Sequence, residues 1–483
     1  PRDVDVMAQL ERLQAPPTEF AEFPPEPEGL HEDEAFRYEI GTVQVPTSGG
    51  GTAEQPTMDF VKNRLKRGIA QSLSGARYEH YECLPTETLQ RMVSKILNGE
   101  TAEGPRSIIT ACRGIALDKG ERKVRPVAIG EAIRRIAGRV VCVQDNAAIA
   151  AMLTEVMQFG VAVKGGIEYA YHSVRQHMMS AYDEFEQRYS SEDDDGDDDD
   201  DEVPGILKVD FKNGYNSTQR SKMLSQVEVK MPRLLRFTRY CYAQVGRLVF
   251  MYKGKVVQVL DSKFGSQQGD PLGGHYFALS IFDFMEELHA AFPEACVSWI
   301  VDDLTVSDKQ GQLEKVAKFI AEKGPAYGLF KNETKGEFYT PFSARNATFQ
   351  PSATITGRYR YNYAQNGFGK LLGAPLGNAE FEAARALDIA KELTSGAKHL
   401  KRIQDAQLEY VLLKYCVCTV ITHLLRMLEP GTVKGAIQYH ERAVRTQFGR
   451  IAIEAARKQQ ELPDMAWEWA QQPVAQGGCG LRC

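Results

Sequence analysis

The sequence predicts an α+β fold with a helical segment toward its C-terminal end. Apolar, β-branched stretches with acidic residues at or near their ends, such as 206–210 and 295–304, alternate with stretches of helical periodicity. From residue 378 to residue 471 the pattern is almost wholly helical. Strands mixed with helices and then followed by helices alone are typical of an α+β body that carries a helical appendage.

The elements can be placed in chain order from these patterns. Residues 1–60 are rich in Pro and Glu without a sustained period, which predicts a tail or a linker. Beyond them the periodicity predicts helices near 58, over 85–97, 131–157 and 271–292, and from about 305 to 327. It predicts strands over 107–117, 123–129, 205–210, 247–252, 255–260 and 295–304.

Composition sets the broad class. The chain has 483 residues, of which 43% are hydrophobic and 25% charged, so it is globular and too large for a small disulfide-stapled scaffold. Its longest apolar stretch, 410–428, is interrupted by Lys414, His423 and Arg426. Because a membrane span needs about 20 mostly apolar residues, we expect no transmembrane helix and no membrane partner.

Cysteine usage and the first residue bear on the compartment. Nine dispersed cysteines without a CxxC pair indicate a reduced, intracellular protein, in the nucleus or an organelle and not secreted. The chain begins with Pro1 and shows no signal-peptide pattern, so we expect a product excised or trimmed from a longer one.

The net charge of −6 is dominated by one segment. Ten acids lie between Glu192 and Glu202, which predicts a disordered acidic insertion over 190–203. Without it the chain is mildly basic. Residues 113–139 contain eight basic residues against three acids, a composition that suits a triphosphate and template footprint, although a solvated basic face would look the same.

Three carboxylates follow predicted strands. Asp210 ends the strand 206–210, and Asp302 and Asp303 follow the strand 297–301. If the strands are neighbours in one sheet, the three acids meet at one edge, where so much negative charge is costly unless cations neutralise it. Mg²⁺ is the natural partner of such oxygens. The alternative is that each acid is a solvated strand end.

The order of these acids and of a Gln-Gly-Asp-Pro element resembles the palm of a reverse transcriptase. Six segments carry the resemblance: 209–220, 266–274 and 300–303 are similar to the first three palm motifs, 328–335 to the fourth, 117–127 to the fingers hairpin, and 371–373 to the primer grip. Segments 74–80, 159–168 and 477–482 are similar to elements of the non-LTR retrotransposon branch.

The resemblance implies a right-hand polymerase with fingers, palm and helical thumb. The corresponding domains would be an N-terminal extension at 1–60, fingers and the start of the palm at 61–204, palm at 205–375, and a helical thumb at 376–483. It implies an RNA-directed DNA polymerase, a nucleotidyltransferase that adds deoxynucleotides to a primer 3′-OH by a two-metal mechanism. Its partners would be an RNA template, a DNA primer or RNA–DNA hybrid and a dNTP, in a larger ribonucleoprotein or polyprotein context.

The resemblance also implies residue roles. Two Mg²⁺ or Mn²⁺ ions would be held by the catalytic acids Asp210, Asp302 and Asp303. Nucleotide-binding residues would be Lys119, Arg125, Tyr215, Gln268, Gly269 and Lys335, and primer-binding residues Leu372 and Gly373. Tyr215 would exclude a ribose 2′-hydroxyl and Lys335 would protonate the departing pyrophosphate. A core aromatic and an exposed helix-end lysine are the plainer alternatives for these two residues.

A second function class stays open. The chain could be a catalytically silent, retroelement-derived RNA-binding or structural subunit of a larger ribonucleoprotein assembly. The intact acids at 210, 302 and 303 favour the enzyme. RNA synthesis on the same palm is disfavoured by Tyr215.

Overall fold

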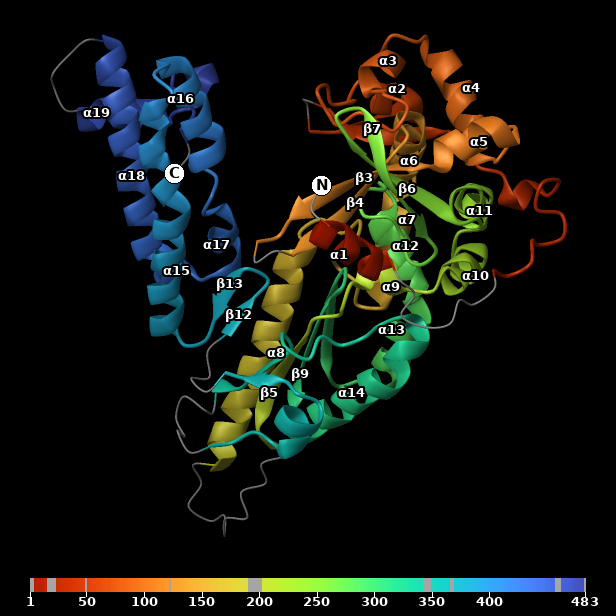
Figure 1. The fold of residues 1–483 in the computed structure, drawn as a ribbon. Coiled ribbons are helices and arrows are strands. Elements are labelled where there is room, and N and C mark those ends of the chain that lie inside the picture. Colours follow the sequence, from red (N-terminus) through yellow and green to blue (C-terminus); the bar gives the residue numbers. More distant parts are fainter. Residues whose placement is uncertain are drawn as a thin grey trace. The chain divides into compact units, whose positions relative to one another are not determined.

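A computed structural model describes residues 4–14, 23–47, 50–120, 123–189, 202–341, 349–364, 369–456 and 462–481 (Figure 1). The chain forms two compact units. The first comprises Pro1–Gly166, Leu207–Glu337 and Ser352–Asn362, and the second comprises Ile167–Ile206, Phe338–Pro351 and Tyr363–Cys483. Most of the predicted acidic insertion, 190–203, lies outside the described residues. The mixture of helices and small sheets confirms the predicted α+β class.

A four-stranded sheet in the first unit carries the predicted fingers hairpin. Its order is β4-β3-β6-β7, with bounds β3 Cys112–Asp118, β4 Val124–Gly130, β6 Gly246–Tyr252 and β7 Lys255–Ser262. β3 runs antiparallel to β4 and parallel to β6. The predicted strand 107–117 is wrong at its start, because Glu103–Thr110 is helix α5. Pro105 lies in the first turn of α5, where its missing N–H leaves no helical bond unmade.

The second sheet carries the acids. Its order is β11-β10-β5-β9-β8, with bounds β5 Pro204–Val209, β8 Cys296–Ile300, β9 Asp303–Lys309, β10 Glu337–Tyr339 and β11 Asn362–Tyr363. β8 and β9 form a hairpin in which Ile300 pairs with Asp303. β9 is the neighbour of β5 in this sheet. The strand that precedes Asp210 and the strand that contains Asp303 therefore lie side by side.

The N-terminal segment is more regular than its composition predicts. Val4–Gln14 forms helix α1, and β1 (Thr42–Pro46) pairs with β2 (Thr52–Pro56). Leu10 of α1 is fully buried among side chains of the four-stranded sheet, including Phe250 and Leu260. Tertiary burial therefore stabilises a helix that local periodicity does not announce.

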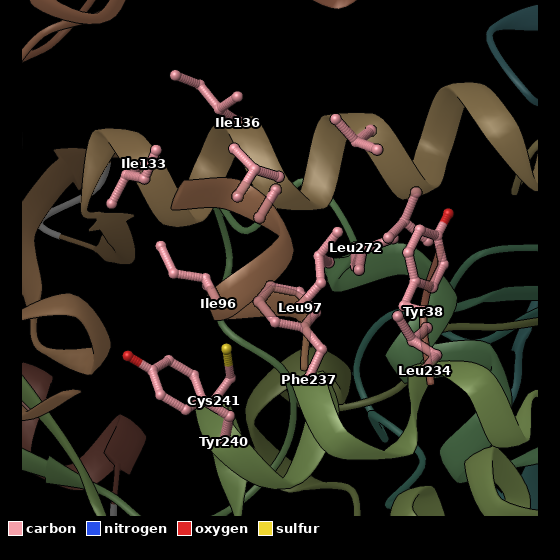
Figure 2. Close-up of a cluster of buried hydrophobic side chains, with 14 of the residues drawn as sticks. Tyr38, Ile96, Leu97, Ile133, Ile136, Leu234, Phe237, Tyr240, Cys241 and Leu272 are labelled. Atoms are coloured by element: carbon pink, nitrogen blue, oxygen red, sulfur yellow. The ribbon is translucent and has the colours of Figure 1, made fainter. Parts of the chain in front are cut away.

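The main core of the first unit joins several helices. Side chains of α4 (Thr86–Leu97), α6 (Ala132–Gln144), α10 (Arg220–Lys230) and α11 (Leu235–Tyr242) pack together with Leu272, Tyr276 and Leu279. Figure 2 shows part of this core, where α4, α6 and α11 meet around Leu272. In α4 the buried residues Leu89, Val93, Ile96 and Leu97 follow the spacing of one helical face. This core fixes α6 and α11 beside the Gln-Gly-Asp-Pro turn.

The predicted helix 271–292 is two helices. α12 covers Gly273–Ser280 and α13 covers Phe282–Ala291, with a break at the buried Ile281. The Ser280 hydroxyl donates to the Phe277 carbonyl at 2.6 Å, a local bond that competes with the helical ladder. The other helices of this unit are α2 Thr57–Lys62, α3 Tyr78–Glu82, α7 Asn146–Glu155, α9 Gly214–Ser217 and α14 Gln310–Lys323.

The second unit is mostly helical. It contains α8 (Gly166–Tyr189), the hairpin β12 (Gly369–Leu371) and β13 (Ala374–Leu376), α15 (Ala379–Thr394), α16 (Ala406–Leu412), α17 (Thr422–Met427), α18 (Pro430–Ala456) and α19 (Asp464–Gln471). α15 packs along α18. A separate core of Leu413, Val444, Phe448, Trp467 and other apolar residues holds its C-terminal helices together.

One stretch bears on the expectation of no membrane helix. Among the described residues, Ala406–Met427 is long and apolar enough to cross a membrane on length and composition alone, and α6 with α7 would qualify as a bent pair. Core helices of soluble proteins meet the same criteria. Leu413 is buried in the second unit's core, and Glu409, 4% exposed, pairs with Arg450, so this stretch has packing partners within its own unit.

Candidate active site

Asp210 lies directly after β5 and is held by the segment that follows α14. Its backbone carbonyl accepts from the Asn332 N–H at 2.7 Å, and its carboxylate accepts from the Asn332 side-chain amide at 2.8 Å. The Lys335 ammonium is 3.5 Å from the other carboxylate oxygen. The first and fourth motif segments are therefore in direct contact.

Asp302 lies in the tight turn between β8 and β9. The preceding Val301 has a φ of +58°, a left-handed conformation that is unfavourable for a β-branched residue. The buried Gln158 side chain stabilises it: its amide donates to the Val301 carbonyl at 3.0 Å, and its oxygen accepts the Val301 N–H at 2.9 Å. Such strain is typical of functional turns when neighbours fix it.

The three acids interact electrostatically. Burial raises the pKa of Asp302, repulsion from Asp210 adds to this, and Arg125 and Lys119 act in the opposite direction. Burial also raises the pKa of Asp303, with repulsion from Asp302 and Asp210. The Asp303 side chain is the more exposed, so water screens its repulsion more than that of Asp302. The three predicted catalytic acids therefore lie near enough to one another for their charges to interact.

Tyr215 lies beside this cluster on α9. Its ring stacks on Phe277 of α12, with ring centroids 5.3 Å apart. Burial raises its pKa to about 12, and the Asp302 charge contributes. A Cβ on Gly214 would lie 3.1 Å from the Asp302 Cβ, so the backbone before Tyr215 runs against the catalytic turn. The ring is partly exposed, as a surface for a sugar would need.

The basic hairpin supplies two positive charges to the same region. Leu117 of β3 pairs with Arg125 of β4, and Lys119 follows β3 in the connecting turn. Burial and the repulsion of Arg125 and Lys335 lower the pKa of Lys119, while Asp210 and Asp302 act in the opposite direction. Both predicted phosphate contacts are exposed.

The Gln268–Gly269 turn lies against β4. The Ala128 N–H donates to the Gln268 carbonyl at 2.6 Å. Gly269 has a φ of +113°, and a Cβ there would lie 2.4 Å from the Ala128 carbonyl oxygen. Only glycine fits this close approach. The turn and the hairpin strand that carries Arg125 are therefore docked together.

Leu372 and Gly373 form the turn between β12 and β13, with φ values of +48° and +94°. These values are those of a tight hairpin turn, which glycine adopts without strain. Both residues belong to the second compact unit, whereas the other predicted site residues belong to the first.

Sequence reasoning missed several polar residues that shape the site. Gln158 supports the Val301 turn, and Asn332 binds Asp210. Asn213, with a φ of +52°, donates its side-chain amide to the Leu13 carbonyl at the end of α1, at 2.7 Å. The sequence signal that could have pointed to Gln158 is its amide side chain directly before the Phe159-Gly160 segment. No local signal announces the contact between Asn213 and Leu13, because 200 residues separate the two.

The three carboxylates are chemically suited to bind a hard divalent cation. Carboxylate oxygens are the ligands that Mg²⁺ and Mn²⁺ prefer, and a cation would relieve the repulsion that raises the pKa of Asp302. Among the described residues, no three acidic, histidine or cysteine side chains form a group that could hold a metal ion as they stand. Asp210 instead faces Asn332 and Lys335, and a bound cation would compete with the Lys335 ammonium for its carboxylate.

Comparison with known proteins supports the family resemblance. No protein-family profile matches the chain. The chain is 23% identical, over 284 residues or 57% of its length, to the retrotransposable element SLACS 132 kDa protein of Trypanosoma brucei gambiense. The match covers 22% of that protein, so this chain spans about a fifth of its length. The chain is thus similar to a retrotransposon protein, and the resemblance inferred from its motifs is confirmed.

Solved structures that align with part of this chain include telomerases. Telomerase of Candida albicans, in complex with a fragment of telomeric RNA, aligns with a TM-score of 0.36 and 10% identity over 76% of this chain and 63% of that one. Apo telomerase of Candida tropicalis aligns with a TM-score of 0.36 and 12% identity over 73% of this chain and 65% of that one.

Proposed function

We propose that the chain is an RNA-directed DNA polymerase that extends a primer on an RNA template. The observation that carries the proposal is the cluster at the edge of β5 and β9, where Asp210 and Asp302 repel each other beside Tyr215 and the basic hairpin. A site that concentrates three acids next to two exposed cations suits a magnesium-bound triphosphate, whose net charge is still negative. The retrotransposon relative supports the same class.

The proposed reaction is the attack of a primer 3′-oxygen on the α-phosphorus of a deoxynucleoside triphosphate, with loss of pyrophosphate. Asp210, Asp302 and Asp303 would hold two Mg²⁺ or Mn²⁺ ions. When bound, these ions would supply activation of the 3′-hydroxyl and charge stabilisation at the leaving oxygen. Lys119 and Arg125 would bind the triphosphate, and Arg125 could use both arms of its guanidinium.

The remaining residues would position the substrates. Tyr215 would lie under the deoxyribose, where its ring collides with a 2′-hydroxyl. Gln268 and Gly269 would present backbone to the nucleotide and the template. Lys335 would leave Asp210 when metal binds and would then be free to give a proton to the departing pyrophosphate.

The same proposal extends to the domain plan. The first unit would supply fingers and most of the palm, and the helical segment 376–483 would be the thumb. Leu372 and Gly373 would contact the primer. An RNA template, a DNA primer and a dNTP would be the partners, within a larger ribonucleoprotein or polyprotein, in the nucleus or an organelle.

One observation favours the silent alternative. Both Asp210 oxygens face hydrogen-bond or ion-pair partners, Asn332 and Lys335, so the protein itself can satisfy this carboxylate. A retroelement-derived subunit that binds RNA without synthesis would keep such a closed arrangement when Mg²⁺ is added.

The discriminating experiment is primer extension on poly-rA annealed to oligo-dT, with dTTP and either Mg²⁺ or Mn²⁺. We expect extension by the natural chain, loss in Asp302→Ala, and full activity in Asp388→Asn, which changes an exposed acid of α15. No extension by the natural chain with either metal would contradict the polymerase. Retained RNA binding in that case would support the silent subunit.

A further inference from the structure

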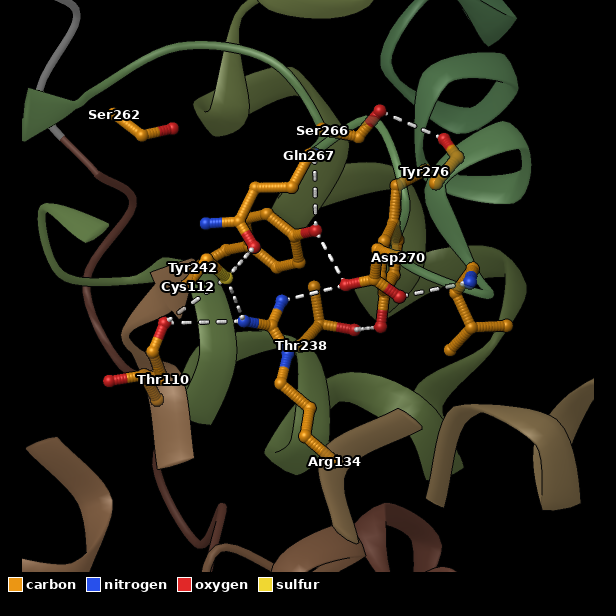
Figure 3. Close-up of polar contacts among 12 residues, drawn as sticks. Thr110, Cys112, Arg134, Thr238, Tyr242, Ser262, Ser266, Gln267, Asp270 and Tyr276 are labelled. Atoms are coloured by element: carbon orange, nitrogen blue, oxygen red, sulfur yellow. Dashed lines mark hydrogen bonds and ion pairs between the residues drawn. The ribbon is translucent and has the colours of Figure 1, made fainter. Parts of the chain in front are cut away.

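The Gln-Gly-Asp-Pro turn is anchored through the side chain of Asp270. One carboxylate oxygen accepts from the Arg134 guanidinium at 2.6 Å and from the Tyr242 hydroxyl at 2.7 Å (Figure 3). The other oxygen accepts the Leu272 N–H at 2.9 Å. The Tyr242 hydroxyl in turn accepts the Gln267 N–H at 3.3 Å. Asp270 therefore connects the turn to both α6 and α11.

This anchor is buried. The side chains of Arg134 and Asp270 are 2% and 6% exposed, and Tyr242 is fully buried. A second arm of the Arg134 guanidinium donates to the Thr110 carbonyl at 3.3 Å. A buried ion pair gains little net stability over an apolar pair, so its retention suggests that it holds a conformation.

The opposite side of the turn is held by the four-stranded sheet. Ala128 of β4 donates to the Gln268 carbonyl, and Gly269 lies directly against the Ala128 carbonyl. Cys112 of β3 donates its thiol to the Gln267 side-chain oxygen at 3.0 Å. Residues 267–270 are thus clamped between the sheet on one side and the Asp270 anchor on the other.

The clamped turn keeps two unused polar side-chain atoms among the described residues, one of which is the side-chain nitrogen of Gln267. The side-chain oxygen of Gln268 is buried and has no hydrogen-bond partner among the described residues. A buried acceptor without a partner is costly unless a donor arrives with a ligand. The same turn touches β4 three residues after Arg125, so a shift of the turn would move both groups.

We propose that Asp270 is a positioning residue, which acts through Arg134 and Tyr242 to fix the Gln268–Gly269 backbone against β4. This inference rests on the proposed polymerase function, in which that backbone faces the incoming nucleotide and the templating base. Asp270 touches neither substrate. It sets the distance between the turn and the strand that carries Arg125.

The first test compares two tyrosines of the same helix. Tyr242→Phe removes the hydroxyl that links Asp270 and the Gln267 N–H. Tyr240→Phe removes a hydroxyl that accepts from Thr101 at 2.8 Å, away from the turn. We expect Tyr242→Phe to raise the KM for dTTP about tenfold, as loss of a hydrogen bond to a charged group implies, with kcat within about twofold. Tyr240→Phe should match the natural chain.

Asp270→Asn is the second variant, and it should raise the same KM further if it folds. Primer extension by the natural chain in the same assay tests the proposed function itself. A failure of the positioning role can therefore be distinguished from a failure of the proposed function. Equal KM values for the Tyr242 and Tyr240 variants would overturn the positioning role.

Amide hydrogen exchange provides a readout that needs no catalysis. We expect faster exchange over 267–272 in Tyr242→Phe than in Tyr240→Phe, at equal thermal midpoints. Unchanged exchange over this turn would overturn the inference whether or not the natural chain extends a primer.

Discussion

Two acidic sites in the first unit are built in opposite ways. Asp270 is buried, and its carboxylate accepts from Arg134, Tyr242 and a backbone N–H. Asp302 is half-buried beside another acid, and burial together with the repulsion of Asp210 raises its pKa, against the charges of Arg125 and Lys119. The first acid is compensated from within the protein, as a structural acid must be. The second is compensated only in part, by the charges of Arg125 and Lys119, which is typical of a functional site.

The largest expected effect on activity is at Asp302. Asp302→Asn keeps the shape of the side chain but removes the charge. We expect primer extension to fall about 10³-fold or more, because electrostatic stabilisation of the transferred phosphoryl group is lost. Folding, measured by circular dichroism, should be unchanged. Near-normal activity in this variant would show that Asp302 is an ordinary strand-end acid.

The largest expected effect on stability is at the compensated site. Arg134→Met leaves Asp270 buried and unpaired, and we expect a loss of about 3–5 kcal/mol in the free energy of unfolding. Arg247→Met, which changes an exposed arginine of β6, is the matched control and should be near neutral. Urea denaturation measures both variants. A loss below about 1 kcal/mol in Arg134→Met, the range of exposed pairs, would remove the contrast between the two sites.

A substitution of Tyr215 tests whether the site around Asp302 is shaped for a deoxynucleotide. Tyr215→Ala removes the ring that stacks on Phe277, and we expect ribonucleotide incorporation relative to deoxynucleotide to rise at least about tenfold. Single-nucleotide incorporation with UTP and dTTP measures the ratio. Tyr415→Ala, at an exposed position in the second unit, serves as control. An unchanged ratio would return Tyr215 to the role of a core aromatic.

A substitution of Lys335 tests the role of its ion pair with the Asp210 carboxylate. The ion pair is largely exposed, so Lys335→Met should change the free energy of unfolding by less than about 1 kcal/mol. If the lysine serves pyrophosphate departure, kcat should fall while the KM for dTTP changes less. Lys315→Met on α14 is a matched control for an exposed lysine. A variant with unaltered kcat would limit Lys335 to pairing with Asp210.

The smallest expected effect is a pH dependence of stability. Because the folded-state pKa of Asp302 is raised above its unfolded value, the protonated acid favours folding. This contribution is full below the ordinary Asp pKa and is lost as pH rises through the raised value. As the pH rises through the raised pKa, the natural chain should lose this contribution and Asp302→Asn should not. The free energy of unfolding of Asp302→Asn should therefore increase relative to that of the natural chain. A pH-independent stability difference between Asp302→Asn and the natural chain would contradict the raised pKa.

The sequence predicts the acids better than their surroundings. β5 and β8 are apolar, Asp210 directly follows β5, and Asp302 comes two residues after the end of β8, so the neighbouring positions of the two acids follow from pattern and motif order. Gln158 and Asn332 could not be assigned roles in this way, because their partners lie 143 and 122 residues away in sequence. The α1 helix was missed for a similar reason, since its stability depends on burial of Leu10 against distant strands.

The most direct test of the central claim is a Mn²⁺ titration followed by electron paramagnetic resonance. The protein would carry dTTP and a chain-terminated primer on poly-rA, so that no turnover occurs. The account predicts protein-bound Mn²⁺ that Mg²⁺ displaces, that is lost in Asp302→Asn and that is kept in Asp388→Asn. Equal Mn²⁺ binding by the natural chain and Asp302→Asn would contradict it, because the ions would then be held by something other than the cluster at the edge of β5 and β9.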